Sequence, residues 1–315
     1  MAKQIEFDYY ITPDGKTYSF HHQSADGVPC VTGRFLQQFS GQGMPAITYI
    51  TQRGPFQHGE TVLDYRLEPR RIAYVHRRQG CDRAAYWDIR ADIINYLRPN
   101  RQTTNTFSAG RLRKILPSGA KRDIDVFIES GPGYGARDTG QWDETAITET
   151  LVFYAPDPIF YDPDTERQSM EIDLCSDLIF PFTFPFIFCG SGVNQTDTIS
   201  YSGTWLSYPV ITIRGPASGA IIRNITTNEK IEFTTDIPAG RTITINCAYG
   251  AKTVLDDTGA NWIGALSTDS DLATFHIAPD PEAPLGVNSI NAQARDGDVS
   301  TTQFTVSFVT RYIGI

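Results

Sequence analysis

Short runs in which hydrophobic and polar residues alternate fill the C-terminal third of the chain. In the segment RTITIN, Ile243 and Ile245 alternate with threonines, and Phe304 and Phe308 share one face of the last run. A period of two places successive side chains on opposite faces of a strand. Turn residues separate these runs at intervals of about ten residues. The pattern predicts a sandwich of two β-sheets, or a jelly roll, over residues 201–315.

The N-terminal half also shows strand patterns, most clearly over residues 47–78. In the second part of this stretch, a strand would place Val62 and Arg66 on one face and Leu63 and Tyr65 on the other. This alternation predicts strands with one polar and one apolar face. The whole chain is therefore expected to be mainly β.

A single stretch, residues 82–98, has the periodicity of a helix. Ile93 and Leu97 are four residues apart and fall on one stripe. Asp82 is suited to cap the N-terminus, and Pro99 disfavours helical backbone in the residue before it. We therefore expect one α-helix, which ends at residue 97 or 98.

A boundary between two domains is predicted near residues 155–164, where the sequence APDPIFYDPD favours a stiff, extended connector. A second proline-containing aromatic stretch, FPFTFPFIF, follows it. We divide the chain into an N-terminal domain over 1–163, a Phe/Pro-rich linker over 164–200 and the sandwich over 201–315. The last strand, 302–315, either closes the sandwich or crosses back to the N-terminal domain.

Charge is distributed unevenly along the chain, although the net charge is only −9. Residues 151–315 hold 8 basic and 19 acidic side chains, whereas residues 53–122 hold 15 basic and 6 acidic ones. A basic segment can attract nucleic acid, and it can equally complement an acidic surface of a neighbouring protein subunit. Five arginines are the candidates for a subunit interface: Arg66, Arg70, Arg71, Arg77 and Arg78.

Cysteine usage and hydropathy bear on the compartment. The five cysteines form no CxxC pair, which favours reduced, buried thiols. No apolar run approaches the roughly 20 residues of a membrane helix, and the N-terminus lacks the apolar core of a secretory signal. We expect assembly in a cytoplasm and no membrane partner.

Chemistry-bearing motifs are sparse. The five histidines show no helical zinc spacing, and GxSxG and GxxxxGK[ST] are absent. Acidic pairs such as Asp256-Asp257 and the Asp269-Ser270-Asp271 cluster could hold calcium or hydrolyse glycosides, but they lie beside turn residues, where aspartate binds the backbone. We expect no enzyme activity, no catalytic residues, no cofactor and no metal.

Two tryptophans, Trp205 and Trp262, could stack on a sugar if their rings are exposed. In a sandwich a tryptophan is more often part of the core.

Several segments, in this order, resemble the distal tail protein family of long-tailed, siphovirus-type bacteriophages. In the N-terminal half they are RGPFQHGETVLDYRLEPRRI, LPSGAKRDIDVFIESG and LVFYAPDPIFYDP. In the C-terminal half they are YPVITIRGPASGAIIRNITTNEKIEF, ANWIGALSTDSDL and the terminal RYIGI.

The resemblance implies a structural virion protein. Members of the family form a ring, usually a hexamer, from β-barrel-like N-terminal domains with one helix, and carry galectin-like C-terminal sandwiches. The ring joins the tail tube to the tail-tip hub or fibre proteins of the baseplate, next to the tape measure protein, and DNA passes through its channel. It implies a place at the distal end of the virion tail, after assembly in the host cytoplasm.

Two alternatives remain open on the sequence. One is a tail adhesin whose sandwich binds host-surface glycan in host attachment, with Trp205 and Trp262 as contacts. The other is a tail-associated glycosidase, which needs two carboxylates that face each other across a cleft, roughly 5–10 Å apart.

Overall fold

The computed structural model describes residues 7–23, 32–99, 101, 107–133, 146–171, 193–297 and 301–315. The chain folds as two compact units. Unit 1 comprises Met1–Pro163 and Tyr312–Ile315, and unit 2 comprises Asp164–Arg311. Residues 172–192 of the predicted linker, including its FPFTFPFIF stretch, lie outside the described residues.

Unit 1 is built from antiparallel strands that pair into one sheet. The order of pairing is β3-β4-β7-β10-β9-β8-β1-β2. Its two end strands, β2 and β3, follow each other in the chain with only residues 20 and 21 between them. The strands are β1 (Phe7–Ile11), β2 (Thr17–Ser19), β3 (His22–Gln23), β4 (Gly33–Ser40), β5 (Ile47–Gln52), β6 (Thr61–Leu67), β7 (Arg70–Gln79), β8 (Gly110–Ile115), β9 (Lys121–Ser130), β10 (Ala146–Ala155) and the beginning of β11 (Phe160–Glu171).

Aromatic residues fill the core of unit 1. The rings of Phe20 and Tyr74 are stacked with centroids 4.5 Å apart, and Phe153 meets both rings edge-on. Such aromatic pairs contribute about 0.5–1.5 kcal/mol beyond the area they bury.

The predicted helix is confirmed as α1 (Arg83–Leu97). The Asp82 side chain accepts a hydrogen bond of 2.8 Å from the Ala85 N–H and caps the N-terminus. Ile93 and Leu97 are buried, as their spacing predicts. Arg98 is extended, because the following proline disfavours helical backbone.

Unit 2 is a sandwich, as the alternation of its residues predicts. One sheet contains the order β18-β17-β13-β21, and the other has the order β12-β19-β15-β16. Two 3₁₀ turns, η2 (Ile263–Ala265) and η3 (Pro284–Gly286), lie in the connections. The strands are β12 (Val193–Ser200), β13 (Val210–Arg214), β14 (Ala217–Ser218), β15 (Ile221–Asn224), β16 (Glu229–Glu232), β17 (Thr242–Asn246), β18 (Thr253–Asp256), β19 (Val287–Ala294), β20 (Asp296–Gly297) and β21 (Gln303–Tyr312).

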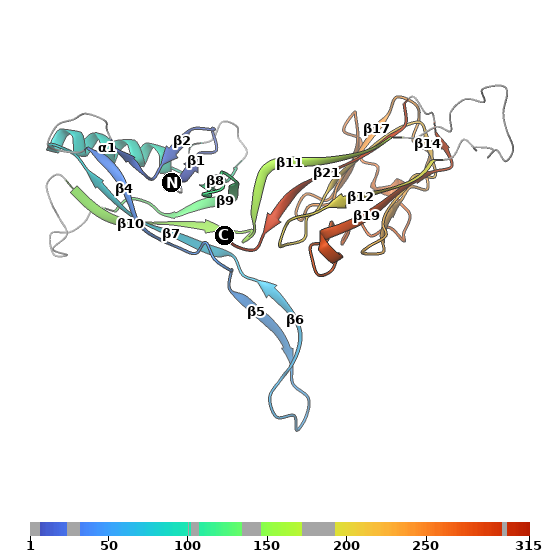
Figure 1. Cartoon of the computed structure of the whole chain (residues 1–315), viewed down its shortest axis with the longest axis horizontal. Helices are drawn as coiled ribbons and strands as arrows, with labels where there is room; N and C mark the ends of the chain where they lie inside the picture. Colours follow the sequence, from blue (N-terminus) through green and yellow to red (C-terminus); the bar gives the residue numbers. More distant parts are fainter. Residues whose placement is uncertain are drawn as a thin grey trace. The chain divides into compact units, whose positions relative to one another are not determined.

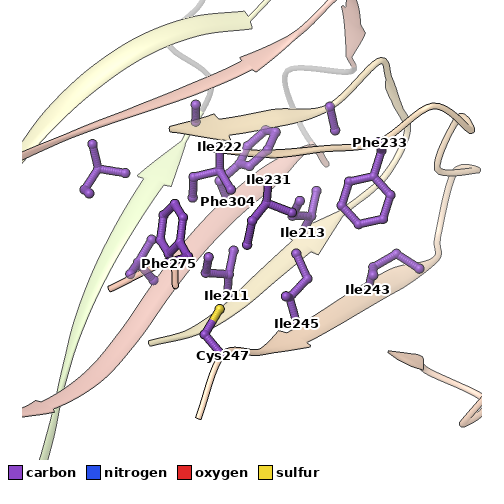
Figure 2. Packing of buried hydrophobic residues seen from close by; sticks show 14 of the residues in the cluster. Ile211, Ile213, Ile222, Ile231, Phe233, Ile243, Ile245, Cys247, Phe275 and Phe304 are labelled. Carbon is purple, nitrogen blue, oxygen red and sulfur yellow. The ribbon is translucent and has the colours of Figure 1, made fainter. Parts of the chain in front are cut away.

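The inward faces of these strands make the core of unit 2 (Figure 2). Each fully buried isoleucine or phenylalanine stabilises the fold by about 1.5–3 kcal/mol. Ile243, Ile245, Phe304 and Phe308 are buried, as predicted. Their neighbours in this core include Ile211, Ile213, Ile222, Ile231, Phe233, Cys247 and Phe275.

The sequence left open whether the last strand closes the sandwich or returns to the N-terminal domain, and it does both. Residues 303–307 of β21 pair with β13 inside unit 2. Residues 312–315 belong to unit 1, so the chain returns there after crossing the sandwich.

The expectation of reduced thiols is wrong for Cys81, which forms a disulfide. Spacing along the chain does not reveal which distant thiols the fold brings together. Cys247 is free and buried. Cys30, Cys175 and Cys189 lie outside the described residues. Within the described ranges, no helix is long and apolar enough to cross a bilayer, and no cluster of three metal-ligating side chains occurs.

Candidate functional site

The most distinctive surface of unit 1 is an arm formed by β5 and β6. Within the described residues, these two strands pair only with each other. They continue the β4–β7 hairpin outward, and Figure 1 shows them projecting from the body of unit 1. We call residues 47–67 the arm.

The arm has one apolar and one polar face. Tyr49 pairs with Tyr65, whereas Thr48 pairs with Arg66 on the opposite face. A β-bulge between Ile50 and Thr51 interrupts this register.

The bulge changes the faces that simple alternation predicts. It leaves Leu63 without an opposite residue and pairs Val62 with Thr51, two residues from Tyr49. Val62 therefore joins the apolar face of the arm rather than the face of Arg66. Sequence alternation alone could not reveal this extra residue.

The apolar face of the arm is open to solvent. Tyr49 is 58% exposed, Leu63 59% and Tyr65 49%. An isolated two-stranded hairpin is marginally stable in water, and contiguous exposed apolar residues mark interaction surfaces. The arm therefore has the character of an element that packs against another molecule.

Arg70 fixes the base of the arm. Its side chain is buried, and its guanidinium donates hydrogen bonds to the carbonyl oxygens of Gly41 (3.2 Å), Gly43 (2.8 Å) and Ile313 (2.8 Å). It also lies 4.8 Å from the centre of the Phe160 ring. Burial lowers the pKa of Arg70 to about 10, so the group remains charged at neutral pH.

Residues 312–315 pack closely on the chain at the base of the arm. The Ile315 N–H donates to the Gln42 oxygen at 3.1 Å. A β-carbon on Gly314 would lie 2.9 Å from the backbone of Gly43, so only glycine fits without a shift. The returning chain and Arg70 together hold residues 41–43 in place.

The five predicted arginines do not gather on one surface. Arg66 on the arm is exposed, and Arg71 is exposed with a 2.8 Å ion pair to Glu129. Arg77 is half-buried. Arg70 and Arg78 lie inside unit 1, where Arg78 forms a buried ion pair with Glu149.

The two tryptophans are half-buried. Trp262 packs against the core of the sandwich, and its Nε1 donates to Asp256 at 3.2 Å. The Trp205 N–H donates to the Arg311 oxygen at 3.2 Å. These positions resemble core packing more than a sugar-stacking platform.

The Asp256 side chain binds backbone N–H groups of the turn that follows it. One carboxylate oxygen accepts hydrogen bonds from the N–H groups of Thr258 (2.9 Å) and Ala260 (2.8 Å). The Thr258 hydroxyl and these N–H groups lower the pKa of Asp256 to about 2. Asp271 instead accepts from the N–H of Lys230 in strand β16 at 2.9 Å. Asp256 thus binds the backbone of its own turn, and Asp271 binds the backbone of a distant strand.

Among known proteins, no family model and no curated protein matches the chain. Among solved structures, the crystal structure of the phage SPP1 Dit protein matches over 98% of this chain and 99% of its own, with a TM-score of 0.62 and 12% identity. The chain has the fold of this Dit protein. The likeness confirms, at the level of the fold, the resemblance to distal tail proteins seen in the sequence.

The SPP1 Dit protein is described as a paradigm of the hub adsorption apparatus of phages that infect Gram-positive bacteria. Two structures of the phage P2 baseplate in its activated conformation, one with Ca and one with Sr, each cover 96% of this chain. Their TM-scores are 0.45 and 0.44, at 12% and 11% identity.

Proposed function

We propose that this chain is a structural subunit of a phage tail hub, and that copies of it assemble into a ring at the distal end of the tail. The observation that carries the proposal is the arm, whose apolar face lies open on an element that pairs with nothing else in the described chain. The Dit fold supports the choice of a hub role over other structural roles.

A second copy of the chain is the natural cover for the arm. If each subunit offers one arm and receives one, the contact joins two different surfaces and repeats around a closed ring. A hexamer is the stoichiometry we propose. The exposed Arg66 and Arg71 are then candidates for the rim of this contact.

The proposed ring connects the tail tube above to the hub or fibre proteins below, beside the tape measure protein. DNA passes through its central channel. In this role the chain works by shape and surface complementarity rather than by catalysis, and it assembles in the host cytoplasm before it becomes part of the virion.

Removal of the apolar face tests the proposal. We expect the wild-type chain to form a closed oligomer, measured as mass by light scattering. The double variant Tyr49→Ser, Tyr65→Ser should keep its thermal unfolding profile, because both rings are exposed in the subunit, but should assemble about a hundredfold more weakly.

The matched control is Tyr249→Ser, which removes an exposed tyrosine of unit 2 and should leave assembly unchanged. A wild-type chain that stays monomeric would contradict the proposed function. A double variant that assembles as well as the wild type would show that the arm is not the contact.

A further inference from the structure

The tip of the arm presents Phe56 in an unusual way. The side chain is fully exposed, and the residue has a positive φ of 68°. Left-handed backbone costs a residue with a side chain about 1–2 kcal/mol, and glycine or asparagine is the usual choice there. Neither the backbone nor the burial of the ring therefore explains a phenylalanine at this position in the isolated subunit.

Hydrogen bonds from Gln57 hold the tip in this shape. Its N–H donates to the Gly54 oxygen (3.2 Å), and its side-chain oxygen accepts from the Gly54 N–H (2.9 Å). Its side-chain amide also donates to the Thr61 hydroxyl at 2.8 Å. The ring of Phe56 is thus presented on a braced turn, which reduces the entropy lost when it binds.

The length of the arm places this ring beyond its own domain. The strand β5 has six residues, which span about 20 Å at the rise of an extended strand. A fully exposed ring at the end of such a strand contacts no part of its own subunit. Any apolar surface that receives it belongs to another molecule.

Charge indicates what that surface looks like. Residues 52–59 contain Arg53 and no acidic side chain. The whole chain carries a net charge of −9. A second copy therefore offers acidic side chains that a basic, aromatic tip complements.

We propose that Phe56 is the anchor of the arm, and that it inserts into an apolar recess with an acidic rim on a second copy of this chain. The inference rests on the proposed ring and names the residue that contributes most to its contact. Aromatic residues that enter a pocket at an interface commonly dominate the binding free energy.

The test compares Phe56→Asn, at the tip of the arm, with Leu285→Asn, a matched variant in unit 2. Asparagine tolerates left-handed backbone, so Phe56→Asn should keep or raise the unfolding temperature of the subunit. The oligomeric ring formed by this variant should nevertheless have a dissociation constant at least tenfold higher, measured by sedimentation over a range of protein concentrations. Phe56→Gly, which removes the strain entirely, should behave in the same way.

Leu285→Asn is the matched control. Leu285 also has a positive φ, 57°, and is 88% exposed, but it lies in unit 2. This change should leave the dissociation of the ring as it is. Raised salt should weaken the oligomer of the wild-type chain more than that of Arg53→Gln. Salt screens the attraction between Arg53 and the acidic rim, and the variant has already lost this charge.

The outcomes separate this inference from the proposed function. A Phe56→Asn chain that forms rings as stable as the wild type overturns the anchor and leaves the ring intact. A wild-type chain that never assembles overturns both. If Leu285→Asn weakens the ring as much as Phe56→Asn does, the effect is not specific to the tip and the anchor is again overturned.

Discussion

His276 lies between two carboxylates in unit 2. Its Nε2 is 3.0 Å from Glu282, and its Nδ1 is 3.1 Å from Glu229 and 2.9 Å from the Thr274 oxygen. Burial lowers the pKa of His276, but the contacts with Glu229, the Thr274 oxygen and Glu282 outweigh it and raise the pKa to about 9. The imidazolium is therefore a structural cation that ties together three parts of the sandwich.

This residue makes the stability of unit 2 depend on pH. Because the folded pKa is above the ordinary value of 6.5, the stabilisation is complete below pH 6.5 and is lost as the pH rises through about 9. The full shift corresponds to about 3.4 kcal/mol, and solvent screening of this partly exposed group reduces it, so we expect a loss of about 2 kcal/mol in unfolding free energy over this range, measured by urea titration. His276→Gln should flatten the dependence, and an equal slope in this variant would contradict the assignment.

At the scale of the element, the arm depends on its base as much as on its own strands. Residues 312–315 and Arg70 hold residues 41–43 by direct hydrogen bonds. The arm therefore leaves unit 1 from a fixed point. A defined direction lets the same arm meet the same surface on every neighbour, which a closed ring requires.

Arg70 and Arg71 form a natural pair of test positions. Arg70→Ala leaves three carbonyl oxygens without their donor and should cost about 3 kcal/mol in the unfolding free energy of unit 1. Hydrogen exchange at residues 41–46 should rise. Arg71→Ala removes an exposed ion pair to Glu129 and a contact with the Tyr154 ring 6.0 Å away, and should cost under about 1 kcal/mol. Equal effects of the two changes would show that the base is not held by Arg70.

At the scale of the whole molecule, the sequence predicts those helices and strands whose apolar positions, spaced at the period of the element, face the core of their own domain. The strands of the sandwich, such as the one with Ile243 and Ile245, face the core as their alternation requires. Helix α1 begins and ends where Asp82 and Pro99 indicate. Local patterns suffice there because each element buries one face in its own domain.

The arm and the arginines show where such prediction stops. The alternation around Tyr65 is the same whether its apolar face meets the core of its own domain or a second molecule. Arg70 and Arg71 are adjacent and chemically identical, yet one is buried and the other exposed. These differences depend on contacts between distant segments, such as Arg70 with Ile313, that no local pattern contains.

The most direct test of the central claim is electron microscopy of assembled phage tails in which this chain carries a label. We expect a ring of labels at the distal end, where the tail tube meets the hub or fibre proteins. Labels that decorate the length of the tube, or tails that lack the label at the tip, would contradict it.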